Sequence, residues 1–168
     1  MSETIRTIGD TGNARGLLSF AGAHLVLAPG DLRIIAAPGD VVRTDPPARG
    51  IGWIAMLEQW RPVYALSFDL APVVDEAAAA RPMCAVLGHG SALYALLCDD
   101  IQIMRGAGPV FRPLAPSMQA PGLPIRDLAL DARGLLCGTD ANRLGRCIGV
   151  AIRGDQAPAR VGRAGVEA

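Results

Sequence analysis

The chain has 168 residues, of which 51% are hydrophobic and 19% are charged, and its formal net charge at pH 7 is zero. This composition supplies enough apolar material for one domain, or for two small lobes that share a core, and it argues against a largely disordered chain. The balanced charge gives no electrostatic basis for binding nucleic acid, so we expect no nucleic-acid partner.

Neither a signal peptide nor a membrane-spanning segment is predicted. The first residues lack a basic region followed by an apolar one, and no apolar run reaches about 18 residues. We therefore expect a cytoplasmic protein with no direct membrane insertion.

Three regions follow one another along the chain. Residues 1–15 are polar and rich in glycine, which predicts a flexible N-terminal arm. Residues 151–168 lack apolar periodicity, which predicts a disordered C-terminal tail. The domain itself is expected to span residues 16–150.

Within the domain, short apolar runs alternate with Gly, Pro, Asp and Asn, which predicts an all-β fold with minor α content. Three pairs of apolar runs flank short connections that contain glycine and predict β-hairpins. They cover residues 17–20 with 25–27, 84–87 with 93–97, and 128–130 with 135–137. Helices are expected to be brief, at 75–81 and 140–144, the second with Thr139 or Asp140 as its N-cap.

A weak internal repeat relates the two halves of the chain. Residues 23–35 (AHLVLAPGDLRII) align without a gap to residues 92–104 (ALYALLCDDIQIM), at an offset of 69. Ala, Leu, Asp and Ile recur at matching positions. The repeat predicts two similar lobes, and chance likeness between amphipathic strands is the alternative.

Residues 52–70 (GWIAMLEQWRPVYALSFDL) form two apolar segments separated by a polar corner at Glu58-Gln59. Their spacing resembles the signature of CheW-like domains, which runs Gly, two apolar residues, Asn-Leu-Arg-Gly, three residues, Pro-Val, one residue, Asp-Leu. Pro62-Val63 and Leu66 occupy the matching positions. The polar identities are replaced, and the residues standing for Asn, Arg, Gly and Asp are Ala55, Leu57, Glu58 and Ala65.

The resemblance extends in element order over about residues 16–148 and implies a specific fold. CheW-like domains consist of two SH3-like five-stranded β-barrel lobes that share a core. The resemblance also implies a function: a non-enzymatic chemotaxis scaffold that links a histidine kinase regulatory domain and a chemoreceptor through protein–protein contacts, without a cofactor.

Two other functions stay open on the sequence. One is a small β-barrel that binds a ligand, although the apolar repeats favour filled barrels over a cavity. The other is a degenerate CheW-like module that pairs with another CheW-like domain in a pilus or gliding pathway.

No chemistry-bearing cluster is evident. The four cysteines form no C-x-x-C pair, and the two histidines, His24 and His89, have no metal ligand at suitable spacing. We expect no metal, no cofactor, no catalytic residue, and no Ser–His or Cys–His pair oriented by a carboxylate. Cys84 and Cys98 are predicted to be buried, with the option of facing each other across a hairpin.

The corner of the signature segment is the predicted partner-binding site. Trp and Arg are frequent interface anchors, so Trp60 and Arg61 join Leu57 and Glu58 as candidate contacts. In a continuous strand Trp53 and Trp60 would lie on opposite faces. Because Leu57 replaces the family's Arg, we expect a specialised partner with an apolar counter-surface. The Pro-rich loop 112–121 is either a second recognition strip or a rigid connection.

Overall fold

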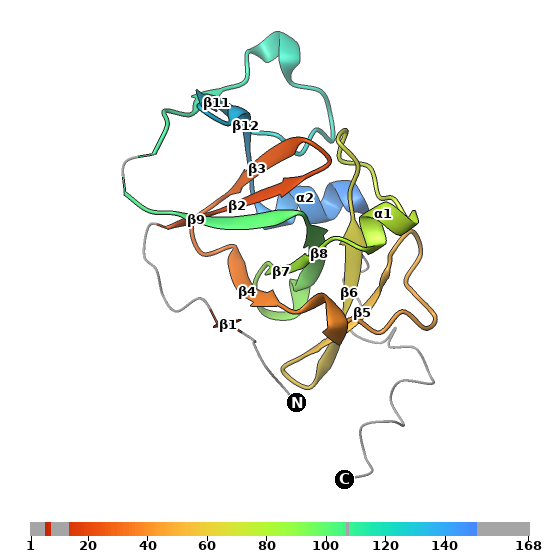
Figure 1. Cartoon of the computed structure of the whole chain (residues 1–168). Helices are drawn as coiled ribbons and strands as arrows, with labels where there is room; N and C mark the ends of the chain where they lie inside the picture. The colour runs from red at the N-terminus through yellow and green to blue at the C-terminus, as the bar shows by residue number, and fades with distance from the viewer. Residues whose placement is uncertain (1–5, 8–13, 107, 151–168) are drawn as a thin grey trace.

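The computed structural model describes residues 6–7, 14–106 and 108–150. They form two six-stranded sheets, which we call lobe A (order β1-β4-β7-β8-β6-β5) and lobe B (order β10-β11-β12-β3-β2-β9) (Figure 1). Each sheet contains the five strands of one expected lobe plus a two-residue strand at one edge. The all-β, two-lobe prediction is therefore confirmed.

The strands of lobe A are β1 (Arg6–Thr7), β4 (Leu32–Ala36), β5 (Gly52–Met56), β6 (Gln59–Ala65), β7 (Met83–Leu87) and β8 (Tyr94–Cys98). The strands of lobe B are β2 (Arg15–Phe20), β3 (Ala23–Leu27), β9 (Asp100–Met104), β10 (Arg112–Pro113), β11 (Asp127–Asp131) and β12 (Gly134–Thr139). The helices are α1 (Glu76–Ala79) and α2 (Ala141–Ile148), and the 3₁₀ turns are η1 (Pro38–Asp40), η2 (Gly90–Ala92) and η3 (Pro116–Met118).

All three predicted hairpins are present, as β2–β3, β7–β8 and β11–β12. The second helix is longer than predicted, with eight residues, and its N-cap is Asp140, whose side chain accepts a hydrogen bond from the Arg143 N–H. Part of the expected N-terminal arm, Arg6–Thr7, forms β1 on the edge of β4. Residues 8–13 and the predicted tail 151–168 lie outside the described residues.

The sequence repeat corresponds to a repeat in strand pairing. In lobe B, Leu18 lies opposite Leu25 in the hairpin and opposite Ile101 of β9. In lobe A, the residue equivalent to Leu18 at the offset of 69 is Leu87. It lies opposite Tyr94 in the β7–β8 hairpin and opposite Leu32 of β4. A β-bulge between Leu32 and Ile34 then shifts the register of lobe A. In both halves of the chain, the strand that follows the hairpin belongs to the other lobe: β4 follows β2–β3 and lies in lobe A, and β9 follows β7–β8 and lies in lobe B.

The remaining hairpins of the two lobes are also equivalent, at an offset of 75. In β5–β6, Gly52 lies opposite Val63. In β11–β12, Asp127 lies opposite Gly138. Both hairpins therefore have connections of two residues. They lie at opposite ends of the molecule (Figure 1).

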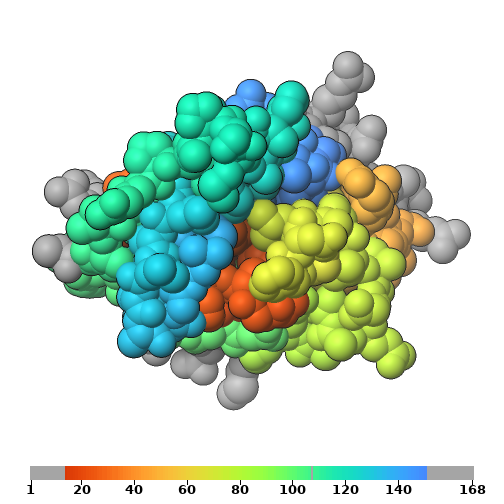
Figure 2. Space-filling model, turned by 90° about the horizontal axis from the view of Figure 1, so that it is seen from above, coloured from red at the N-terminus to blue at the C-terminus, as the bar shows by residue number. Residues whose placement is uncertain are grey.

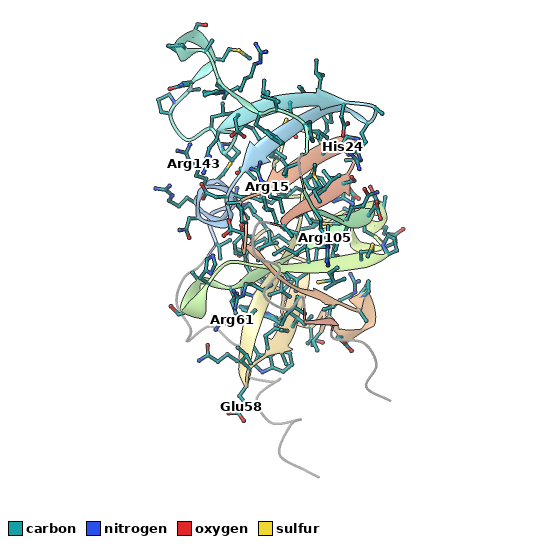
Figure 3. All side chains as sticks on the ribbon, turned by 90° about the vertical axis from the view of Figure 1, so that its left-hand side faces the viewer. Arg15, His24, Glu58, Arg61, Arg105 and Arg143 are labelled. Atoms are coloured by element: carbon teal, nitrogen blue, oxygen red, sulfur yellow. The ribbon has the colours of Figure 1, made fainter. Side chains whose placement is uncertain are left out.

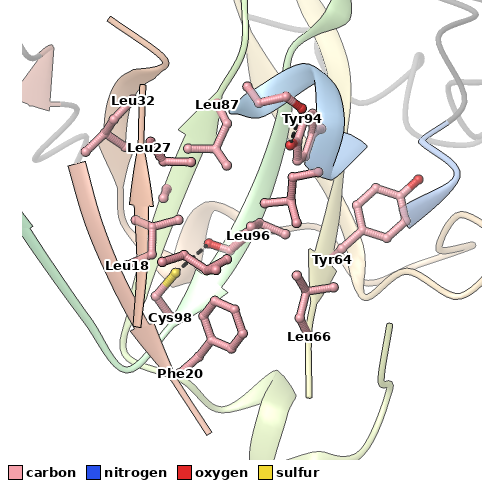
Figure 4. Close-up of a cluster of buried hydrophobic side chains, with 14 of the residues drawn as sticks. Leu18, Phe20, Leu27, Leu32, Tyr64, Leu66, Leu87, Tyr94, Leu96 and Cys98 are labelled. Carbon is pink, nitrogen blue, oxygen red and sulfur yellow. Dashed lines mark hydrogen bonds between the residues drawn. The ribbon is translucent and has the colours of Figure 1, made fainter. Parts of the chain in front are cut away.

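A shared core joins the lobes, as predicted from the family resemblance. It takes buried side chains from both sheets, among them Leu18 and Phe20 of lobe B and Tyr64 and Leu96 of lobe A (Figure 4). Two further clusters fill the lobes themselves, a larger one in lobe A and a smaller one in lobe B.

Helix α2 closes the shared core and is fastened at both ends. At its start, the buried carboxylate of Asp31 accepts a hydrogen bond from the Ala141 N–H at 2.7 Å. At its end, a guanidinium N–H of Arg49 donates to the Ile148 carbonyl at 2.7 Å. Both groups come from loops that lie far from the helix in sequence, so α2 ties the two halves of the chain together.

Cys84 and Cys98 are free and buried, and they do not face each other. Cys84 pairs with Leu97 across the β7–β8 hairpin, so Cys98 lies on the opposite face of the sheet. Cys84 belongs to the lobe A core and Cys98 to the shared core. Burial, with a smaller contribution from the Asp40 charge, raises the pKa of the Cys84 thiol from 9.0 to about 12. These thiols behave as small apolar residues.

Candidate partner-binding site

The β5–β6 hairpin reverses at Leu57–Glu58, one residue earlier than the corner predicted at Glu58-Gln59. Met56 and Gln59 form the last pair, and the two turn residues have φ values of +49° and +63°. Two consecutive positive φ values define a type I′ turn, which normally carries Asn, Asp or Gly. Leu57 and Glu58 therefore both adopt a left-handed conformation that neither Leu nor Glu favours.

Leu57 combines this backbone with an exposed apolar side chain. It is 81% exposed, the largest fraction among the exposed large hydrophobic residues of the described chain. A left-handed backbone costs a non-glycine residue roughly 1–2 kcal/mol. Neither solvation nor local backbone geometry favours Leu at this position.

Trp53 and Trp60 lie on the same face of the hairpin, because the turn reverses the chain. Trp53 lies opposite Pro62, and Trp60 lies opposite Ala55. The opposite faces expected for a continuous strand do not apply here, because the strand is interrupted by the turn at residues 57–58. Trp53 is buried and donates through Nε1 to the Asp45 carbonyl at 2.7 Å, whereas Trp60 is partly exposed.

Arg61 lies on the other face of the hairpin and is only 7% exposed. Its guanidinium donates to the Ser91 carbonyl at 2.7 Å and to the Gln59 side chain at 2.6 Å, while its Nε is buried without a hydrogen-bond partner. Figure 3 shows Glu58 at the tip of the hairpin and Arg61 further into the lobe. The structure thus brings Leu57, Glu58 and Trp60 to the surface and places Arg61 behind them as a brace.

Lobe B carries an equivalent apolar surface that sequence analysis missed. Leu130 and Leu135 lie opposite each other in β11–β12, at the positions of Ala55 and Trp60 shifted by 75. They are 75% and 50% exposed. The alternation of side chains along the strands does not show which face of a hairpin is buried, because that depends on which face packs against the rest of the protein.

This surface is one wall of a groove of about 550 Å³ that the Pro-rich loop completes. The loop is anchored by buried Leu114, whose carbonyl accepts a hydrogen bond from the Gln119 side chain at 3.0 Å. Val110 and Met118 are exposed on the groove side. Figure 2 shows the loop (teal) beside the β11–β12 hairpin (cyan). The loop is therefore both a rigid connection and an exposed apolar surface.

Both histidines have partners that sequence analysis did not predict. His24 Nδ1 lies 2.8 Å from the Ser19 hydroxyl, because the two residues are paired across β2–β3. No carboxylate contacts the other His24 ring nitrogen among the described residues, and the absence of catalysis stays a prediction. His89 Nε2 lies 2.8 Å from the Asp31 carboxylate, next to the start of α2.

The described part of the chain contains no group of three or more His, Cys, Asp or Glu side chains arranged to hold a metal ion. In the same residues, no helix has the length and apolar character needed to cross a membrane.

No protein-family model matches the chain, and no curated protein matches it in sequence. Among solved structures, it is similar to the crystal structure of the scaffolding protein TtCheW from Thermoanaerobacter tengcongensis. The TM-score is 0.52 and the sequence identity 13%, over 76% of this chain and 88% of that chain. The chain therefore has a CheW-like fold.

Proposed function

We propose that this protein is a non-enzymatic CheW-like adaptor that joins two proteins through separate apolar surfaces. One surface is the β5–β6 tip, with Leu57, Glu58 and Trp60 as direct contacts and Arg61 as the brace behind them. The exposed, strained position of Leu57 is the observation that carries the proposal. The partners are a histidine kinase regulatory domain, a chemoreceptor or a related signalling protein, and the location is cytoplasmic.

The fold supports a positional mechanism. The two equivalent hairpins lie at opposite ends of a molecule whose lobes share one core, so both surfaces have a fixed separation and orientation. A rigid module that binds two proteins raises the effective concentration of each near the other. Such a mechanism needs neither a cofactor nor a reacting group.

The chemistry of Leu57 restricts the partner. Burying a Leu side chain stabilises a complex by about 1.5–3 kcal/mol, so affinity need not depend on a charge at this position. A partner whose carboxylate matches an Arg would leave that carboxylate unpaired here, at a cost of roughly 1–3 kcal/mol. We therefore expect a specialised partner with an apolar counter-surface and weak binding to an ordinary chemotaxis kinase.

A second candidate function is pairing with another CheW-like domain, as in a pilus or gliding pathway. The lobe B groove favours it, because its exposed apolar walls fit an apolar hairpin tip such as the one that carries Leu57. A ligand-binding barrel has less support, since apolar clusters occupy the interior of both lobes.

Titration calorimetry tests the proposal with the kinase regulatory domain and the receptor encoded by neighbouring genes, and with a generic chemotaxis kinase domain for comparison. The proposal predicts tighter binding to the neighbouring partner, and Leu57→Arg should shift preference toward the generic domain. Tight binding to the generic domain that Leu57→Arg leaves unchanged would contradict it.

A further inference from the structure

Without the two-residue strands β1 and β10, each lobe has a five-stranded sheet, and a further pairing covers three of the four edges of these two sheets. β1 pairs with β4, β10 pairs with β11, and Val42 forms a bridge with Trp53 of β5. The fourth edge is β9, which has no pairing on its outer side among the described residues. Unpaired edges are sites where another strand can add to a sheet.

The pseudo-symmetry of the lobes shows that this type of edge accepts a strand. β9 is the counterpart of β4, because Ile101 and Leu32 occupy equivalent pairings at the offset of 69. The outer side of β4 holds β1 in an antiparallel arrangement. The same outer side of β9 is open.

The backbone groups on this open side can be assigned from the pairing with β2. The Asp99 N–H donates to the Ser19 carbonyl at 2.8 Å, so the backbone of Ser19 faces β9. Backbone direction alternates along a strand, so Leu17 and its pair Gln102 also face each other. Ile101 and Ile103 therefore direct their N–H and C=O groups outward.

We propose that β9 binds β9 of a second copy of this chain, antiparallel and centred on Gln102. This register sets Ile101 of one copy opposite Ile103 of the other, so the outward N–H and C=O groups satisfy each other in two hydrogen-bonded pairs. Gln102 lies opposite its own counterpart in the non-hydrogen-bonded position between them. The two lobe B sheets become one continuous sheet.

The charges that flank β9 favour this antiparallel register. It places Asp99 of each copy opposite Arg105 of the other, whereas a parallel register would align like charges. The Asp99 side chain is 54% exposed and approaches Arg81 only at 3.9 Å, although it also accepts from the Ala21 N–H at 3.1 Å. Arg105 is exposed and forms no hydrogen bond or ion pair with any described residue.

The antiparallel register centred on Gln102 predicts a specific disulfide cross-link, which a dimer formed through another surface would not give. In the full chain with exposed Cys147 changed to Ser, Gln102→Cys brings two thiols to adjacent positions across the dimer axis. Non-hydrogen-bonded pairs have Cα atoms about 4.5 Å apart, which a disulfide can bridge. Mild oxidation should give a disulfide-linked dimer. The control Arg105→Cys, opposite Asp99, should give little.

Sedimentation velocity over a range of concentrations up to the solubility limit measures the association of the wild-type chain. Ile103→Pro removes an outward N–H without touching the pairing with β2, and it should abolish the dimer with the circular dichroism spectrum unchanged. Arg105→Glu should raise the dimer dissociation constant roughly tenfold at low salt and less at high salt.

A wild-type chain that stays monomeric at every concentration would overturn the proposal. So would a dimer that survives Ile103→Pro, or equal cross-linking of the Gln102→Cys and Arg105→Cys variants. Since β9 is not part of the β5–β6 tip, Ile103→Pro should leave binding of the adaptor's partner unchanged. The dimer proposal and the adaptor proposal can therefore fail separately.

Discussion

The two equivalent hairpins, β5–β6 and β11–β12, have the same pairing and the same turn length but different turn chemistry. In lobe B, the Asp131 side chain accepts from the Arg133 N–H at 2.7 Å, and Gly134 takes the left-handed φ of +108°. In lobe A, Leu57 and Glu58 take left-handed conformations without a Gly or Asn.

The shared pairing shows what the fold requires of these hairpins, whereas the residues of the turn can differ between the lobes. The lobe B turn uses the residues that its backbone favours, so its geometry has a local explanation. The lobe A hairpin has the same pairing but a different turn backbone, in which two residues that are neither Gly nor Asn take left-handed conformations and the Leu57 side chain is exposed. An exposed Leu on a left-handed backbone fits the proposed role of this turn in contacting a partner.

The largest effect is expected where the two lobes meet. Leu96→Ala in the shared core should lower the free energy of unfolding by about 2–5 kcal/mol, because it leaves a cavity between side chains of both sheets. Unfolding in denaturant should stay a single transition by circular dichroism and tryptophan fluorescence. The matched control Leu130→Ala, at a residue 75% exposed, should change stability by less than about 0.5 kcal/mol. Two separate transitions would show that the lobes are independent.

High pH should lower the stability of the folded chain as a whole, because the buried Cys84 thiol resists ionisation in the folded state. Burial raises the pKa of Cys84 to about 12 from 9.0, so the folded state disfavours the thiolate that the unfolded chain forms. The contribution of this thiol to the free energy of unfolding is therefore fully present below about pH 9. It is lost as the pH rises toward about 12, where the free energy of unfolding falls by roughly 1.4 kcal/mol per pH unit.

Denaturant titrations at several pH values measure this slope. Cys84→Ala should reduce it, whereas Cys137→Ala should reduce it less, because burial also raises the pKa of Cys137 but that thiol is only partly buried. Equal slopes for the wild type and Cys84→Ala would contradict the assignment.

The turn comparison itself predicts a stabilising substitution. Leu57→Asn should raise the free energy of unfolding by about 0.5–1 kcal/mol, because Asn tolerates the left-handed backbone of a type I′ turn. The matched control is Ala132→Asn at the equivalent position of lobe B, where φ is not positive. Thermal unfolding should show a higher Tm for the first variant and little change for the second. A lower Tm for Leu57→Asn would mean that Leu57 contributes packing to the folded chain.

The smallest effect is spectroscopic. Trp60 is partly exposed and Trp53 is buried, so in a Trp53→Phe variant the emission reports on Trp60 alone. Partner binding should shift this emission to shorter wavelength as water is excluded from the ring. In the Trp60→Phe variant, where only Trp53 emits, the shift should be absent.

The sequence predicted the fold well, because the hairpins and the repeat depend on local patterns. The offset of 69 between residues 23–35 and 92–104 proved to be an offset in strand pairing. The extent of α2 was missed, because the groups that fasten it, Asp31 and Arg49, are distant in sequence.

Local sequence patterns predict only part of the geometry around the candidate site, whose role stays a proposal. The spacing locates the corner within one residue, but the faces of Trp53 and Trp60 depend on the number of residues in the turn, which spacing alone does not give. Arg61 was expected beside Trp60, yet strand alternation places its side chain on the buried face. The lobe B surface had no local signal, since exposure of Leu130 and Leu135 depends on which face of the hairpin packs inward.

The most direct test of the adaptor account measures stability and partner affinity on one variant, Leu57→Asn, with Ala132→Asn as the control. If Leu57 contacts the partner, the Leu57→Asn variant should be more stable than the wild type yet bind the kinase domain or receptor encoded nearby at least tenfold more weakly, because it lacks a Leu side chain to bury. The control should match the wild type in both measurements. Unchanged affinity of Leu57→Asn for a partner that binds the wild type would contradict the account.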